Sequence, residues 1–379
     1  MEVAVAATDL RRHALAVLCA LPLAAWSAVL PEDRADALYH SYDGGGVQVT
    51  GPSILVRKGD AKRFSLSANY YVDSISSASI DVITQGSEYN EQRTQYSVGL
   101  DYLHADTTLS LGYTNSDESD YKADTWSISL SQTFFGNMTT LTLGYSRGFD
   151  DVLRNRDDNF AETAEHQNYH VSLTQVLTKD LLLSLNYDAV ADQGYLNNPY
   201  RSVVFFEPSN PSGLGTQPEQ YPNTRASNAI SANLLYYLPW RATLKAGYRY
   251  YADDWDIEAH TLDLGYVHTL GSHWIMEAGF RYYQQTEADF YADIFPRVDA
   301  QNFLARDKEL SNFDDYTLSL GLSYEIRGDF RGLFDKASLN FKYSRIEFSY
   351  SNFSDLSDPA RPDYSFTADV IQAYVSAWY

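Results

Sequence analysis

The sequence has very little cysteine, few basic residues and no long hydrophobic segment outside its N-terminus. It contains one cysteine in 379 residues, Cys19, which lies in the N-terminal apolar run, so the exported chain has no disulfide and no cysteine metal site. No later stretch approaches the ~20 apolar residues that a transmembrane helix needs. With 28 basic and 50 acidic residues the net charge is −22, which disfavours nucleic-acid binding.

The N-terminus has the order of features that marks a secretory signal peptide. Residues 11–13 are Arg-Arg-His, residues 14–24 are apolar, and Ala25-Trp26-Ser27 forms a small-x-small cleavage site. The apolar run is too short to favour a membrane anchor. We therefore expect residues 1–27 to be removed on export, and the mature chain to begin near Ala28.

A five-residue phrase, Leu-x-Leu-Gly-Tyr, occurs at residues 109–113, 141–145 and 262–266 and recurs in looser form along the chain. Its apolar residues occupy every second position, so a strand built from it has one apolar and one polar face. In a soluble sandwich the apolar face turns inward, whereas in a transmembrane barrel it faces lipid and the polar face lines the lumen. The repeat therefore leaves two all-β fold classes to distinguish.

Three further patterns favour the barrel. The last nine residues alternate in the same way and end on Tyr379, which resembles the C-terminal signal that outer-membrane barrels of Gram-negative bacteria present to their assembly machinery. Short polar links alternate with long ones, as periplasmic turns alternate with extracellular loops. Many of the 31 tyrosines stand near predicted strand ends on the apolar face, as interfacial girdles do. The sequence thus predicts an all-β, transmembrane, antiparallel up-and-down β-barrel in the bacterial outer membrane.

Counting the alternating segments gives fourteen strands, an even number that places both ends of the chain in the periplasm. Residues 47–58 also look extended, but one more strand would make the count odd, and Pro52 is unfavourable in a central strand. We therefore expect residues 28–62 to form a periplasmic or lumenal plug segment and residues 63–379 to form the barrel. A sixteen-strand alternative would need residues 47–58 and another strand hidden in a long loop. The predicted strands are 63–73, 95–103, 107–115, 125–134, 139–147, 166–177, 181–190, 228–238, 242–251, 260–270, 274–283, 316–326, 336–345 and 367–379.

Charged residues occupy lumen-facing positions on neighbouring predicted strands, and their signs alternate. Such a ladder can narrow a pore and set its ion preference, or it can be a structural network that satisfies its own charges. Glycines on the same wall keep space open. The predicted lumen-lining residues are Lys245, Arg249, Asp263, Glu277, Arg281, Glu325 and Lys342.

One hairpin offers a candidate for enzymatic chemistry. Folding it about Lys179 places His170 opposite Asp188, with both side chains inward, and Ser172 lies in the next inward pair. A carboxylate, an imidazole and a hydroxyl are the minimum for nucleophilic hydrolysis. Lipid-degrading barrels usually carry that chemistry on the lipid-facing wall, however, so we expect no enzyme and keep a lumen-facing hydrolase as an alternative.

Acidic residues gather in the proposed outer loops, at 117–120, 150–158 and 253–258. They can form a calcium-assisted site or a vestibule that attracts cations, or they can be ordinary solvated loops. No EF-hand or other metal-ligand spacing is present, so the sequence predicts no metal site and no cofactor.

Five stretches of the chain carry a resemblance to a known family, at residues 33–46, 51–53, 194–202, 221–225 and 299–310. They resemble an uncharacterised family of Gram-negative outer-membrane barrel proteins, defined as domain of unknown function 3570. The resemblance implies a barrel, and it implies partners among periplasmic thioredoxin-like proteins and flavin-transferring lipoproteins. Independently of the family, Tyr39, His40 and Asp43, beside three glycines in the N-terminal segment, form either a docking or ligand element or a flexible lead-in.

The function that these patterns favour is porin-like passive transport of a small solute, or export and anchoring with a periplasmic partner. The remaining partners that we expect are outer-membrane lipid and lipopolysaccharide. An occluded structural platform in an extracytoplasmic redox or assembly system is an alternative from another class. Fatty-acid transporters share the fourteen strands and an N-terminal hatch, but the polar lumen argues against a hydrophobic cargo.

Overall fold

The computed structural model describes residues 29–77, 89–328 and 334–379, so the predicted signal peptide and Cys19 lie outside the described residues. The described chain is built from strands and one short 3-10 helix, η1 (Lys308–Leu310). No helix in this part of the chain is both long and apolar enough to cross a membrane. The strands are β1 (Arg34–Gly44), β2 (Val47–Gly59), β3 (Phe64–Ser77), β4 (Tyr89–His104), β5 (Thr107–Asp117), β6 (Tyr121–Phe134), β7 (Thr139–Leu153), β8 (Ala161–Thr178), β9 (Leu181–Gly194), β10 (Ser202–Phe206), β11 (Leu214–Pro218), β12 (Thr224–Leu238), β13 (Ala242–Asp253), β14 (Glu258–Leu270), β15 (Trp274–Gln285), β16 (Phe313–Arg327), β17 (Lys336–Ser354) and β18 (Asp363–Trp378).

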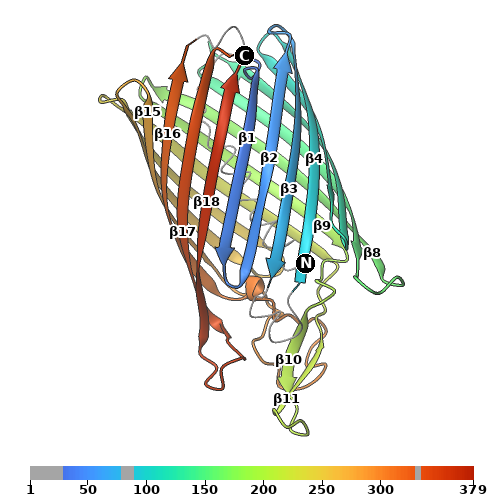
Figure 1. The fold of residues 1–379 in the computed structure, drawn as a ribbon. Coiled ribbons are helices and arrows are strands. Elements are labelled where there is room, and N and C mark those ends of the chain that lie inside the picture. Colours follow the sequence, from blue (N-terminus) through green and yellow to red (C-terminus); the bar gives the residue numbers. More distant parts are fainter. Residues whose placement is uncertain (1–28, 78–88, 329–333) are drawn as a thin grey trace.

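Sixteen of the described strands form one closed antiparallel barrel (Figure 1). Each strand pairs with its neighbours in sequence except that β9 pairs with β12, and β1 closes the ring by pairing with β18 along its whole length. Strands β10 and β11 stand apart as a two-stranded hairpin inside the connection between β9 and β12. Closure leaves no free strand edge in the wall, which is the condition for a sheet to stand in a bilayer.

The two ends of the barrel differ in the length of their connections. At one end, drawn at the top of Figure 1, the connections between strands are short, and we call it the turn end. Strand β1 begins there and β18 ends there. The long connections gather at the opposite, long-loop end, where β10 and β11 project away from the barrel. This asymmetry is the one that the sequence predicts for periplasmic turns and extracellular loops.

The two faces of the wall differ as the repeat predicts. Leu318 and Leu320 on β16 are both 63% exposed on the outer face, although leucine is usually buried in soluble proteins. The alternate residues on the inner face are mainly Ser, Thr, Gly, Asn and charged residues. An exposed apolar band around a polar interior is stable only when the band contacts lipid, so the fold is that of a transmembrane barrel.

Outward-facing tyrosines near the long-loop end are tied to polar groups on the next strand. The hydroxyl of Tyr113 donates to Asp124 (2.5 Å), that of Tyr187 to Asn228 (2.6 Å) and that of Tyr343 to Asp369 (2.5 Å). Each ring therefore faces the apolar band while its hydroxyl stays bonded, which is the arrangement of an interfacial girdle.

The strand count and the plug segment need correction. The prediction of fourteen strands with a plug at residues 28–62 is wrong, because β1 and β2 lie in the wall and complete a barrel of sixteen. The sixteen-strand alternative is right, but both additional strands come from the N-terminal segment and none from a long loop. The outer face of β1 carries mostly small or polar residues, with Tyr39 as its one large ring, so the strand has a weak alternation signal.

Local geometry explains how β1 and β2 enter the wall. Gly45 and Gly46 have φ of 59° and 79°, which lets a two-residue turn join the strands. The pairing of β2 with β3 skips Gly51 and Pro52 between Thr50 and Ser53, so the missing N–H of Pro52 falls in a local gap of that ladder.

The turn after β2 is closed by a single carboxylate. Asp60 accepts hydrogen bonds from the backbone N–H groups of Lys62, Arg63 and Phe64, at 2.9, 2.7 and 2.9 Å. These bonds, the one from Phe64 most, lower the pKa of the Asp60 carboxyl to about 2. At the same end the Tyr379 hydroxyl donates to the carbonyl of Arg57 (2.9 Å) and fixes the last residue against β2.

Candidate functional site

The connection between β15 and β16, residues 286–312, folds back against the inner face of the barrel, and we call it the mouth loop. Phe290 and Leu310 of this loop share a buried cluster with Tyr251 of β13, whose side chain faces the lumen. The Tyr291 hydroxyl of this loop donates to the carbonyl of Asn352 on β17 (2.9 Å). The mouth loop therefore reaches from the wall at β13 to the wall at β17 and narrows the long-loop end.

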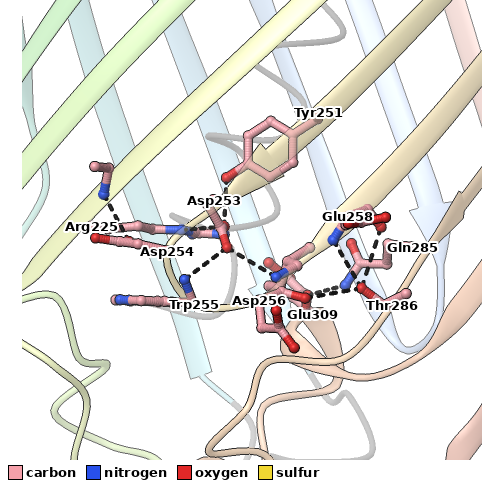
Figure 2. A network of polar contacts seen from close by, with 12 residues as sticks. Arg225, Tyr251, Asp253, Asp254, Trp255, Asp256, Glu258, Gln285, Thr286 and Glu309 are labelled. Carbon is pink, nitrogen blue, oxygen red and sulfur yellow. Dashed lines mark hydrogen bonds and ion pairs between the residues drawn. The ribbon is translucent and has the colours of Figure 1, made fainter.

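A polar network supports the mouth loop from the β12 to β15 side (Figure 2). The Asp253 carboxylate accepts from Arg225 Nε (2.8 Å) and Nη2 (2.6 Å), from the Tyr251 hydroxyl (2.7 Å) and from the N–H groups of Trp255 and Ile257 (3.0 Å each). The Arg225 guanidinium also lies 4.5 Å from the Trp255 ring centre. These contacts fix the short turn after β13 and hold the Trp255 ring in the buried cluster beneath the loop.

Arg306 links two parts of the mouth loop and holds them to the end of β17. Its Nε donates to the Asp293 carbonyl (2.8 Å), and its Nη2 donates to Asp293 Oδ1 (2.9 Å) and to the Ser354 carbonyl (2.8 Å). The guanidinium lies 4.4 Å from the Phe353 ring centre, and Arg306 is only 3% exposed. Asp293 also accepts from the N–H and the hydroxyl of Ser354, so Arg306 and Asp293 together attach the loop to β17.

The connection between β9 and β12, residues 195–223, joins the same assembly, and we call it the hairpin loop. The backbones of Gln220 and Leu304 exchange hydrogen bonds of 2.9 and 2.7 Å, which pair the hairpin loop with the mouth loop. Arg201 and Asp307 add a buried ion pair. On its other side the Tyr200 hydroxyl donates to Asp120 (2.5 Å) in the turn after β5. Burial and the bond to Asp120 raise the pKa of Tyr200 above its ordinary value.

The predicted lumen-lining residues all lie on the inner face of the wall, as the strand pairing requires. Lys245 Nζ lies 3.1 Å from Glu277 Oε1, and Asp263 stands directly opposite Arg281. Glu325 pairs with Arg327 of its own strand (2.6 Å). Arg249 lies over the Tyr251 ring, and Lys342 stands opposite Gly321. The structure thus brings four of the seven predicted charges together as two neighbouring pairs, and it places Arg249, Glu325 and Lys342 beside other residues.

The hydrolase candidate is only partly assembled. His170 Nδ1 lies 2.6 Å from Asp188 Oδ1, in the register that the sequence predicts. The Ser172 hydroxyl instead donates to Asn186 Oδ1 (2.7 Å), and Asn186 in turn donates to Ser231 (3.0 Å). The serine is therefore bonded away from the imidazole that would activate it.

Sequence reasoning missed a second histidine in the same hairpin that bonds to carboxylates. His166 lies between Asp192 (Nδ1 to Oδ1, 2.8 Å) and Asp150 (Nε2 to Oδ2, 3.0 Å). Both ring nitrogens must donate to carboxylates, which only the imidazolium can do. The register that pairs His170 with Asp188 also pairs His166 with Asp192, so that register contained the signal.

The predicted element of Tyr39, His40 and Asp43 is not assembled, because successive side chains of a strand point to opposite faces. Tyr39 is 53% exposed on the outer face, and Asp43 accepts there from Gln48. His40 points inward and is buried, with Nε2 at 2.8 Å from Asp73 Oδ1.

Asp73 is the centre of a buried charge cluster between β1 and β4. It is fully buried, and it bonds both His40 and the Arg93 guanidinium. The Tyr71 hydroxyl lies 3.1 Å from His40 Nε2, and the two rings are stacked. Within the described residues no group of three or more His, Asp or Glu side chains is placed to hold a metal ion.

The wall and the mouth together define a transmembrane β-barrel with a polar lumen narrowed by folded loops. The chain belongs to the family described as protein of unknown function (DUF3570), which matches residues 84–343. No curated protein matches the chain in sequence.

Solved structures that are similar to the chain include the following three. The siderophore receptor PirA from Pseudomonas aeruginosa is 10% identical with a TM-score of 0.45, and the match covers 92% of this chain and 62% of the receptor. OmpT, an outer membrane protein of Vibrio cholerae, is 10% identical with a TM-score of 0.44, over 93% and 100% of the two chains. A Pseudomonas aeruginosa FadL homologue is 13% identical with a TM-score of 0.42, over 92% and 90%. The chain thus spans less than two thirds of the length of the receptor that it matches.

Proposed function

We propose that this protein is an outer-membrane channel for the passive diffusion of small polar solutes. A barrel of sixteen strands is wide enough to leave an aqueous channel unless something fills it. The inner wall carries hydroxyl, amide and paired charged groups, which suit water and polar solutes. The observation that carries the proposal is the ordered mouth loop across a polar lumen, because a narrowed polar passage selects solutes by size.

The proposal also implies partners in the membrane and in the periplasm. The apolar band contacts outer-membrane lipid and lipopolysaccharide, and the strand that ends at Tyr379 is presented to the barrel-assembly machinery. The turn end then faces the periplasm, where a thioredoxin-like or flavin-transferring protein is the partner to test.

Conductance is the direct test of the channel. We expect the purified full-length protein to give steady current steps in a planar lipid bilayer, because water and ions can cross a polar lumen of this width. The control is the same preparation unfolded by heat, which should give none. If the folded protein inserts but remains silent, the channel is ruled out.

A barrel that inserts but conducts no current would support the second candidate function, an occluded structural platform. One observation favours that function. Arg306, the pair of Arg201 with Asp307 and the buried cluster around Trp255 fix the mouth loop on several sides. A loop held so firmly can close a passage as well as narrow it.

We further propose that the pair of His170 and Asp188 is structural and not catalytic. His170→Gln should leave ester and phospholipid hydrolysis at the background level, and should lower stability by about 1 kcal/mol through the lost hydrogen bond. Hydrolysis of a chromogenic ester and thermal unfolding measure the two effects. Ser172→Ala serves as the matched variant, and turnover by the wild-type protein that both substitutions abolish would restore the hydrolase.

A further inference from the structure

The wall from β13 to β17 has a pattern of charged residues and glycines that the proposed function does not by itself explain. On the inner face Lys245 of β13 stands opposite Gly265 of β14. Glu277 of β15 stands opposite Gly321 of β16, and Gly321 stands opposite Lys342 of β17. Gly265 is paired with Gly279, two residues from Glu277, so these charged residues and glycines form two adjacent rows. Gly265 belongs to one of the Leu-x-Leu-Gly-Tyr phrases, and Gly321 belongs to a looser copy.

The glycines are in close contact with the charged side chains beside them. A Cβ atom at Gly265 would lie 3.2 Å from Cβ and 3.3 Å from Cδ of Lys245. At Gly321 it would lie 3.4 Å from Cβ and 4.0 Å from Oε2 of Glu277. Both values for Lys245 are tighter than ordinary van der Waals contact, so the lysine stem occupies the space that a side chain at 265 would take.

The position of the Lys245 side chain over Gly265 determines where the Lys245 ammonium group lies. Lys245 and Glu277 stand on strands separated by β14, yet Nζ reaches Oε1 at 3.1 Å. The lysine can span that strand only because Gly265 presents no side chain in its path. The two charges therefore neutralise each other across β14.

We propose that Gly265 and Gly321 set the free width of the lumen at this level by seating Lys245 and Glu277 against the wall. The inference rests on the proposed channel function for its consequence, although the seating itself does not. A larger residue at either position would lift its charged neighbour into the passage.

Thiol labelling tests the seating without any assumption about conduction. Gly265 and Gly279 stand opposite each other on β14 and β15, but the nearest atoms to a Cβ at Gly279 are Ser319 Cβ (3.6 Å) and the Leu264 carbonyl oxygen (3.9 Å). Only the first position is therefore covered by a long side chain. We expect Gly265→Cys in the folded protein to react with a bulky water-soluble maleimide at least roughly tenfold more slowly than Gly279→Cys, at a pH where both thiols are ionised.

A second variant removes the Lys245 side chain that covers position 265. Lys245→Ala combined with Gly265→Cys should restore the rate to near that of Gly279→Cys, and the wild-type chain measures the background. Equal rates for the two single variants, or no acceleration by Lys245→Ala, would overturn the seating.

Conductance then tests the consequence. We expect Gly265→Leu to lower single-channel conductance by roughly twofold or more, because Lys245 is displaced into the passage. Leu264→Phe enlarges the neighbouring, lipid-facing residue and should leave conductance unchanged. Conductance that Gly265→Leu does not alter in a conducting protein would overturn the inference alone, whereas a silent wild-type protein would overturn the proposed function and leave the seating to the labelling result.

Discussion

Arg306→Ala should release the mouth loop and raise single-channel conductance by roughly twofold or more, because a passage narrowed by a loop widens when the loop is freed. The substitution removes the cation that bonds Asp293 and the Ser354 carbonyl and that stacks on Phe353. Asp293 keeps the N–H and hydroxyl of Ser354 as donors, so the loss is that of the charge-assisted hydrogen bonds of Arg306, about 1.5–3 kcal/mol. That cost falls on the attachment of the loop, since the wall is held by its own ladder of hydrogen bonds.

The matched control is Arg297→Ala in the same loop. Arg297 is exposed and donates only to the nearby carbonyls of Val298 and Asp299 in the described structure, so its loss should leave conductance unchanged. Limited proteolysis provides a second measurement, in which Arg306→Ala should be cut within residues 286–312 faster than the control. Equal conductance and equal cleavage in the two variants would show that Arg306 does not hold the loop.

Asp73→Ala should prevent a large share of the protein from assembling as a heat-resistant barrel. Asp73 is fully buried and neutralises Arg93 while it bonds His40. Its removal leaves a buried guanidinium without its carboxylate, for which about 3–5 kcal/mol is the usual loss of stability. Because the cluster joins β1, β3 and β4 next to the closing seam, the loss should appear in the temperature at which the barrel unfolds.

The comparison for this prediction is Asp101→Ala. Asp101 also faces the lumen and pairs with Arg57 (2.9 Å), but both side chains of that pair are partly exposed, so water can replace the carboxylate. We expect a clearly smaller drop in unfolding temperature for Asp101→Ala. Asp73→Asn, which keeps the size of the side chain, should fall between them. A drop for Asp101→Ala as large as that for Asp73→Ala would contradict the special role of the buried cluster.

Pairs of side chains that face the lumen could be predicted from the sequence where a short turn fixes the register of two strands. The hairpin of β8 and β9 shows this, since folding the sequence about Lys179 is enough to place His170 opposite Asp188. The same register contained the pairing of His166 with Asp192. The third member of that group, Asp150, comes from β7, and its bond to His166 depends on side-chain orientation in addition to register.

The sequence by itself determined the class of fold, because alternation with period two requires a two-faced wall, and apolar residues on an exposed face require lipid. It also located fourteen of the sixteen described strands of the wall. Only the tertiary structure decided that β1 and β2 belong to that wall, because β1 presents mostly small or polar residues outward and is recognised by its pairing with β18. The structure alone also decided what lies in the mouth. The contacts of Arg306 and of Trp255 join segments far apart in the chain, and no local period of the sequence encodes them.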